Sequence, residues 1–84
     1  MAVTAIRVHG ADNVAVVAAD VQPGDVVRLD DGRQLRAVDV IPRGSKVALD
    51  PIAGGQPVVR YGERIGEATK DIAAGEYVHS HNLA

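Results

Sequence analysis

Hydrophobic residues in this chain come in short runs, and Gly, Pro or Asp ends almost every run. Val, Ile and Leu dominate these runs, and apolar residues nowhere keep helical spacing over several turns. Short β-branched runs between turn residues are typical of strands in an all-β domain. One or two short helical turns are expected as well, near Val16–Asp20 or Ile41–Gly44. The pattern predicts strands at Thr4–His9, Asn13–Ala18, Asp25–Leu29, Gln34–Val38, Lys46–Leu49, Pro57–Arg60, Ile65–Thr69 and Tyr77–His81.

A short phrase recurs along the chain, formed by an Asp, an apolar pair, a turn glycine and the start of a β-branched strand. Its glycines are Gly24, Gly44, Gly55 and Gly75, and an offset of 31 residues carries the first two onto the last two. Glycine suits such turns because it adopts positive φ without steric cost. The repeat predicts two pseudo-equivalent halves that pack on each other into one core. The same offset matches Ala37 with Ala68, Ile41 with Ile72 and Val47 with Val78.

The composition is that of one small domain, which we assign to residues 1–84. Its core has to be built from short aliphatic side chains, because the chain has no Phe, Trp or Cys and only two aromatic residues, Tyr61 and Tyr77. A core of this size buries roughly 60% of the surface of the unfolded chain, so we expect a partner to stabilise it further. The absence of cysteine excludes disulfides and thiolate metal sites.

Charge and hydropathy argue against a nucleic-acid-binding, membrane or secreted protein. Nine basic and eleven acidic residues give a net charge of -2, and no basic run or aromatic stacking surface favours nucleic-acid binding. The longest apolar run, Val14–Ala19, is too short to cross a membrane. The N-terminus lacks the basic and apolar regions of a signal peptide. We therefore expect a cytoplasmic protein with no nucleic-acid or membrane partner.

Two of the three histidines, His79 and His81, are two positions apart on the last predicted strand. Side chains at that spacing on a strand point to the same face, so both imidazoles can contact one metal ion or one anionic group. Neutral imidazoles are ligands for Zn, Fe, Mn and similar ions. His9 and Asp12 are the candidates for further ligands, provided that the fold brings the N-terminal loop beside the C-terminal strand. The alternative is a pair of solvated surface histidines.

The third histidine, His9, ends the first predicted strand. Alternation places Ile6 and Val8 on one face of that strand and Arg7 and His9 on the other. The following loop, Gly10–Asn13, has a carboxylate and an amide that can hydrogen-bond the backbone or a ligand. A polar strand end with an Asx turn is the alternative explanation.

Arg60 is a further candidate, because a guanidinium binds carboxylates and the nearby Gly62 and Gly66 allow close approach of a ligand. A hairpin turn with solvated charges explains the same residues equally well. The sequence contains no nucleophile elbow, phosphate loop or pair of catalytic carboxylates. This domain is therefore expected to supply part of a site rather than a complete one.

Four motifs occur in order over nearly the whole chain, and together they resemble one family. They are similar to the N-terminal SAF-type domain of the altronate and galactarate dehydratases, which also occurs as the separate small subunit of sulfolactate sulfo-lyase. The resemblance implies an all-β SAF, or β-clip, fold that is shared with type III antifreeze protein and the sialic acid synthase tail. The motifs are Ile6-Arg7-Val8-His9-x-x-Asp12-Asn13-Val14-Ala15-Val16, Ile41-Pro42-Arg43-Gly44-x-Lys46-Val47-Ala48-Leu49, Tyr61-Gly62-Glu63-x-Ile65-Gly66-x-Ala68-Thr69 and Gly75-Glu76-x-Val78-His79-x-His81-Asn82-Leu83.

The resemblance implies a hydro-lyase that removes water from an aldonate or aldarate to give a 2-keto-3-deoxy acid, with a divalent metal, Fe²⁺ or Mn²⁺, as cofactor. The chain would be the small subunit, inactive alone, with a large catalytic subunit, a sugar-acid substrate and a homo-oligomer as the expected partners. The alternatives are a small subunit like that of sulfolactate sulfo-lyase and a non-catalytic sugar-acid binding or assembly module of the same fold.

The resemblance also carries over site residues, and Arg60 joins them from the argument above. The family usually reads Gly-His-Lys where this chain has Gly44-Ser45-Lys46, and a serine cannot replace an imidazole as a base near neutral pH. Ser45 therefore implies a weakened or altered activity if that histidine moves a proton or binds metal. The expected roles are catalysis for His9 and Lys46, substrate binding for Asp12, Asn13 and Arg60, and metal binding for His79 and His81.

Overall fold

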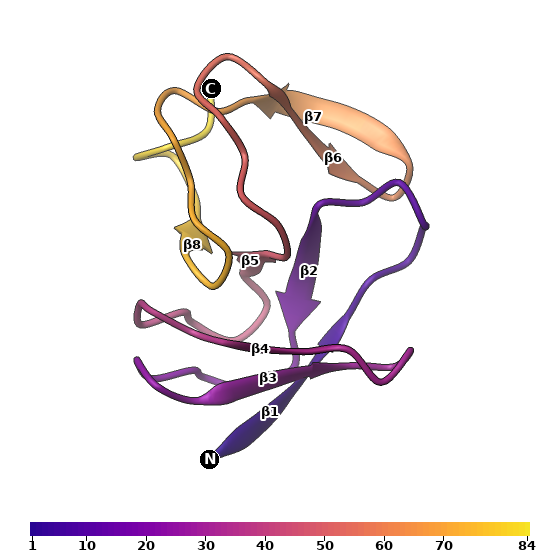
Figure 1. Cartoon of the computed structure of the whole chain (residues 1–84), viewed down its shortest axis with the longest axis vertical. Coiled ribbons are helices and arrows are strands. Elements are labelled where there is room, and N and C mark those ends of the chain that lie inside the picture. The colour runs from indigo at the N-terminus through magenta and orange to yellow at the C-terminus, as the bar shows by residue number, and fades with distance from the viewer.

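The computed structural model describes residues 1–84 and consists of strands, isolated bridges and turns (Figure 1). This confirms the all-β fold class, and every strand expected from the sequence has a counterpart. No helix forms, so no helical segment is available to cross a membrane. The strands are β1 (Ala2–Ile6), β2 (Val14–Val17), β3 (Val26–Leu29), β4 (Gln34–Arg36), β5 (Lys46–Ala48), β6 (Pro57–Arg60), β7 (Glu63–Glu67) and β8 (Tyr77–Val78).

Six strands form one curled sheet in the order β4-β3-β1-β2-β5-β8, and β6 and β7 form a separate hairpin. The pairing of β1 with β3 is parallel, and the other pairs are antiparallel. Figure 1 shows the hairpin at the opposite end of the molecule from β3 and β4, with β2 and β5 between them. One row of Cα partners crosses the middle of the sheet, from Ile6 to Val16, Lys46 and Val78.

The helical turns expected near Val16–Asp20 and Ile41–Gly44 are absent. Val16 and Val17 belong to β2, and the chain after them turns so that Val21 pairs with Ile41 in an isolated antiparallel bridge. The bridge forms in place of a helical turn because it buries both Val21 and Ile41 completely while their backbones pair.

The first strand is shifted relative to the prediction, since it ends at Ile6 instead of His9. Val3 and Ala5 are the residues that β1 buries, whereas Ile6 and Val8 are 54% and 61% exposed. The apolar face that the alternation predicts, with Ile6 and Val8, is therefore exposed to solvent. A period of two fixes which residues share a face but leaves open which face meets the core.

The 31-residue repeat is confirmed in the backbone. The isolated bridge between Val21 and Ile41 recurs between Ile52 and Ile72. Hydrogen bonds repeat in the same way: the Gly24 N–H donates to the carbonyl of Ala37 at 2.8 Å, and that of Gly55 donates to Ala68 at 2.7 Å. The 31-residue offset of the turn glycines thus relates two halves with the same local hydrogen bonds.

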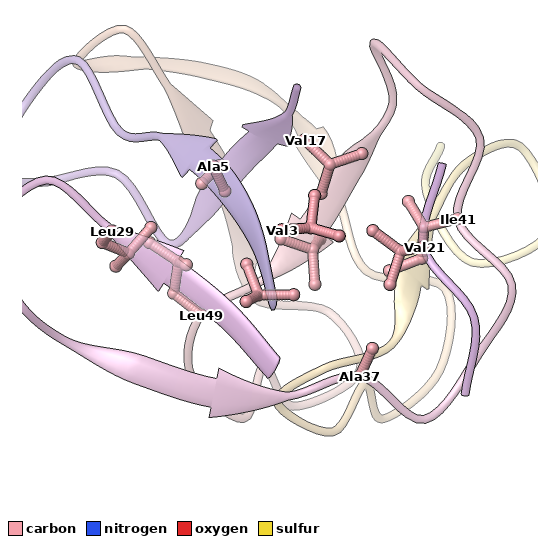
Figure 2. Packing of buried hydrophobic residues seen from close by; sticks show 11 residues of the cluster. Val3, Ala5, Val17, Val21, Leu29, Ala37, Ile41 and Leu49 are labelled. Atoms are coloured by element: carbon pink, nitrogen blue, oxygen red, sulfur yellow. The ribbon is translucent and has the colours of Figure 1, made fainter. Parts of the chain in front are cut away.

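The prediction of one shared core is wrong, because the buried residues form two clusters. Neighbouring residues on β5 show the cause: Val47 belongs to one cluster and Ala48 to the other, since consecutive strand residues point to opposite faces. Figure 2 shows the larger cluster, in which Val21 lies beside Ile41. The larger cluster contains Val3, Ala5, Ala15, Val17, Val21, Val27, Leu29, Ala37, Ile41, Val47 and Leu49. The smaller contains Val14, Ala48, Ile52, Val58, Ala68, Ile72 and Val78, and Val58 contributes to it from the β6–β7 hairpin.

Candidate functional site

Asp12 joins the loop between β1 and β2 to the turn between β6 and β7. It is 4% exposed, and its two carboxylate oxygens accept hydrogen bonds from the backbone N–H of Gly62 at 2.7 Å and of His9 at 3.0 Å. Burial would raise the pKa of the Asp12 carboxyl, but backbone hydrogen bonds from Gly62, His9 and Tyr61, with the charge of His9, hold its pKa below the usual value. Asp12 is therefore ionised, and its hydrogen bonds hold the β1–β2 loop against the β6–β7 turn.

His9 lies on the surface against the same turn. A Cβ at Gly62 would lie 2.9 Å from Cδ2 of His9, so any other residue at this position would displace the ring. Nδ1 of His9 accepts a hydrogen bond from the backbone N–H of Ala11 at 3.0 Å. A neutral imidazole that accepts at Nδ1 carries its proton on Nε2, so His9 presents a hydrogen-bond donor to the surface.

Asn13 attaches the start of β2 to β6. Its amide nitrogen donates to the carbonyl of Pro57 at 3.0 Å, and its amide oxygen accepts from the N–H of Val59 at 2.8 Å. A backbone bond from Asn13 N–H to the Val59 carbonyl, at 3.2 Å, completes the contact. The side chain expected to bind substrate is thus engaged with the backbone of the hairpin.

Arg60 is held by the residue that follows it. Its Cζ lies 4.4 Å from the centre of the Tyr61 ring, and its Nη2 donates to the Tyr61 hydroxyl at 3.2 Å. Tyr61 is the only non-glycine residue with positive φ, 56°, and Gly62 after it has φ of 75°. A two-residue hairpin turn needs positive φ at both positions, and Asn-Gly is the usual choice, so Tyr61 occupies a strained position.

Lys46 lies in the middle of the sheet on the face that the hairpin covers. Its Cα partners on that face are Val16 and Val78, and Val78 belongs to the smaller apolar cluster. Burial lowers the pKa of the Lys46 ammonium, and the positive charge of Arg60 lowers it further. Val58, two residues before Arg60 on β6, belongs to the same cluster, so Lys46 and Arg60 both lie beside it. Including those of the loop that Asp12 holds, five of the expected site residues gather around the β6–β7 hairpin.

His79 and His81 form a second group at the sheet edge, and they do not lie on a strand. β8 ends at Val78, and residues 79–82 form a turn. Both rings still contact one side chain: the Tyr77 ring is 5.3 Å from His79, nearly parallel at 9°, and 5.6 Å from His81, tilted at 46°. The strand geometry that we predicted for the pair is wrong, although the two imidazoles do flank a common neighbour.

The turn forms because of Asn82, which is fully buried. Its amide oxygen accepts from the N–H of His79 at 2.9 Å, and its amide nitrogen donates to the carbonyl of Tyr77 at 2.8 Å. Asp12 bonds the N–H of His9 across the same spacing. Sequence reasoning missed the structural roles of Asn82 and Tyr61. The spacing His-x-x-Asx, present at both His9 and His79, is the signal that would have revealed the two turns.

The chain does not by itself provide a metal site of the usual kind. No group of three or more His, Asp or Glu side chains is placed to hold a metal ion. His9 and Asp12, the expected further ligands, contact the Gly62 turn instead of the pair at the sheet edge. Because two imidazoles are fewer ligands than metal sites generally use, a metal at His79 and His81 would need ligands from another polypeptide.

Ser45 directly precedes β5, and His79 directly follows the partner strand β8. Lys46 and Val78 are Cα partners in the β5–β8 pair, so the next positions outward are Ser45 and His79. An imidazole at position 45 would therefore come next to His79, where this chain has a hydroxyl.

Comparison with known proteins gives consistent matches. The family profile of the altronate/galactarate dehydratase SAF domain matches residues 3–84. Altronate dehydratase of Escherichia coli K12 is 48% identical over 77 residues, which cover 92% of this chain but 15% of that protein. Galactarate dehydratase (L-threo-forming) of the same organism is 40% identical over 87% of this chain and 14% of its own length. The (2R)-sulfolactate sulfo-lyase subunit alpha of Chromohalobacter salexigens is 35% identical, over 90% of this chain and 88% of that subunit.

Proposed function

The chain belongs to the altronate/galactarate dehydratase SAF domain family, and from this membership we propose that it acts with a large catalytic partner in the dehydration of a sugar acid. The reaction would convert an aldonate or aldarate to a 2-keto-3-deoxy acid. The chain spans about 15% of the dehydratases that it matches, so the greater part of such an enzyme would be supplied by the partner.

The observation that carries this proposal is a set of oriented polar groups that no cavity encloses. His9, Lys46 and Arg60 are oriented by backbone hydrogen bonds, sheet register or a stacked ring, but no cavity surrounds them. The one hollow on the surface is lined by Val26, Gln34, Leu35 and Arg36, on the β3–β4 hairpin. Oriented groups without an enclosure suit a domain that completes a site at an interface with another polypeptide.

Sugar-acid dehydration removes the proton α to the carboxylate and expels a hydroxyl as water. Arg60 fits the partner of the carboxylate, because a guanidinium binds both carboxylate oxygens, and the base that takes the proton would come from the large partner. His9 would donate a hydrogen bond from its Nε2–H to a substrate hydroxyl. A divalent metal such as Fe²⁺ or Mn²⁺, with ligands from the large partner beside His79 and His81, would polarise the carboxylate and the hydroxyl.

A second candidate rests on chain length. The sulfo-lyase subunit alpha is the relative that this chain covers almost completely, 88%, and it is named as a subunit. That match supports a domain of this kind acting as a separate small subunit, and it makes sulfolactate a substrate to test beside the sugar acids.

The test combines this chain with Escherichia coli altronate dehydratase from which the matching segment has been deleted. Keto-acid formation from altronate or galactarate is measured with each polypeptide alone and with both, in the presence of Fe²⁺ or Mn²⁺. Activity that needs both polypeptides is the expected result. Sulfite release from sulfolactate in place of keto acid would favour the second candidate, and a stable complex without any turnover would favour a non-catalytic binding module.

A further inference from the structure

Two positive side chains of this domain, Lys46 and Arg60, are half-buried and have no acidic partner. The ion pairs in the molecule are those of the N-terminal amine with Asp25, Arg7 with Asp31, Arg33 with Asp50 and Arg64 with Glu67. Neither Lys46 nor Arg60 is among them, although the chain has eleven acidic residues. Like charges brought together away from water destabilise each other unless an anion lies between them.

Strand geometry directs both side chains to the same space. Val58 and Arg60 are two apart on β6, so they point to one face, and Val58 lies in the apolar cluster between the hairpin and the sheet. Lys46 comes from the sheet side, where its Cα partner Val78 belongs to the same cluster. The register shift of the hairpin lies on β7, where Val58 pairs with Gly66 and Val59 with Arg64, so the alternation along β6 is undisturbed.

The guanidinium of Arg60 is held in place by Tyr61, whose own backbone is strained. Tyr61 adopts positive φ, and its ring and hydroxyl both contact the guanidinium. Nε of Arg60 is inaccessible to solvent and has no hydrogen-bond partner. A strained residue that fixes an unpaired charge is typical of binding sites rather than of solvated hairpin turns.

We infer that Lys46 and Arg60 form a binding site for the carboxylate of a polyhydroxy acid, between β5 and the β6–β7 hairpin. A guanidinium held on one side and an ammonium on the other match the two oxygens of a carboxylate. The inference deepens the proposed function by assigning its substrate-anchoring residues, but binding by this chain alone does not depend on the large partner or on turnover.

The test is a titration of the 84-residue chain with galactarate, followed by NMR of the lysine side chains. The chain has two lysines, so Lys70, an exposed residue on another turn, is an internal control. We expect galactarate to shift the Lys46 signals and to raise the pKa of its ammonium, because a bound carboxylate favours the charged form. Galactitol, the uncharged polyol, should shift neither lysine, and sodium chloride at equal ionic strength controls for screening.

Variants complete the test. Arg60→Gln should weaken galactarate binding about tenfold or more. Arg60→Lys should weaken it less, because lysine keeps the positive charge and loses only the paired N–H donors of the guanidinium. A backbone amide spectrum confirms that each variant is folded. Equal shifts of Lys46 and Lys70, an equal response to galactitol, or unchanged affinity in a folded Arg60→Gln protein would overturn the inference. Binding without turnover in the reconstituted enzyme would leave this site in place and reject the proposed function.

Discussion

Asp12 and Gly62 are 50 residues apart in the chain and are joined by a 2.7 Å hydrogen bond. The bond connects the loop after β1 to the turn of the β6–β7 hairpin, and the ring of His9 packs on the same glycine. Since Tyr61 and Arg60 immediately precede this turn, the position of the guanidinium depends on a carboxylate from the other half of the molecule. The candidate site is therefore assembled by tertiary contacts rather than by one motif.

Removing this carboxylate should destabilise the fold. Asp12→Ala leaves the N–H groups of His9 and Gly62 without their acceptors, and we expect it to lower the free energy of unfolding by about 2–3 kcal/mol. Urea unfolding measures the change. Asp30→Ala is the matched control, because Asp30 is exposed, and it should cost less than about 0.5 kcal/mol. Equal effects of the two substitutions would show that the Asp12 hydrogen bonds contribute nothing.

Low pH should remove the stabilisation by the Asp12 carboxylate from the wild-type protein. The pKa of Asp12 is below its usual 3.8 in the folded state, so the unfolded chain binds more protons at low pH. The stabilisation is complete above pH 3.8 and is lost as the pH falls from there through the folded pKa. Asp12→Asn lacks this titration, so its unfolding free energy should depend less steeply on pH below 3.8. Parallel curves for the two proteins would contradict the assignment.

Gly75 should be the least replaceable of the repeated glycines. It has φ of 90°, and a Cβ there would overlap the carbonyl oxygen of Arg36. Gly44 holds the equivalent place 31 residues earlier, has φ of 81°, and has nothing within 4 Å of the same position. Gly44→Ala therefore measures backbone strain alone, about 1–2 kcal/mol. Gly75→Ala adds the overlap, and its melting temperature should fall well below that of Gly44→Ala; similar values would refute the close approach.

Replacing Tyr61 by Asn should stabilise the fold and weaken the binding of galactarate. Asn tolerates positive φ at this position, so Tyr61→Asn relieves strain and should raise the free energy of unfolding by about 0.5–1 kcal/mol. The same change removes the ring that holds Arg60 and should weaken galactarate binding. Thermal unfolding and the titration described above measure the two effects. A destabilised variant would show that the contact between Arg60 and Tyr61 outweighs the strain.

Ser45→His should create a stronger metal site at the sheet edge. The register places position 45 opposite His79, so the substitution brings a third imidazole to His79 and His81. A gain of about 1.4 kcal/mol would tighten Mn²⁺ binding tenfold. Paramagnetic broadening of the histidine signals by Mn²⁺ reports the affinity, and the double variant with His79→Ala is the control. Unchanged binding in Ser45→His would place the family histidine outside any metal site.

The fold was largely predictable because its signals are local. Runs of β-branched residues set the strands, and the common offset of 31 residues from Gly24 to Gly55 and from Gly44 to Gly75 set the repeat. The errors occurred where a choice depends on distant residues. Ile6 and Val8 are as apolar as Val3 and Ala5, and only packing against the sheet decides which pair is buried.

The candidate site was predictable as a list of residues but not as an arrangement. The spacing His-x-x-Asx signals that Asn82 bonds back to His79, but it does not indicate that this turn ends the last strand before either histidine. Nor does local sequence indicate that Arg60 and Lys46 lie beside the same apolar cluster, because they come from strands in different halves. The roles expected for His9, Lys46, Asp12, Asn13, Arg60, His79 and His81 stay predictions that the variants above can test.

The internal repeat has a consequence for how such a site arises. Arg60 on β6 holds the place that Leu29 holds on β3, and Lys46 on β5 holds the place that Tyr77 holds on β8. Leu29 is buried in the larger cluster, and Tyr77 packs against it. Duplication of a half-domain produces two copies of every position, and one copy of each pair suffices to maintain a core. The second copy is then released from selection for packing, so charge can be acquired there by divergence without loss of the fold.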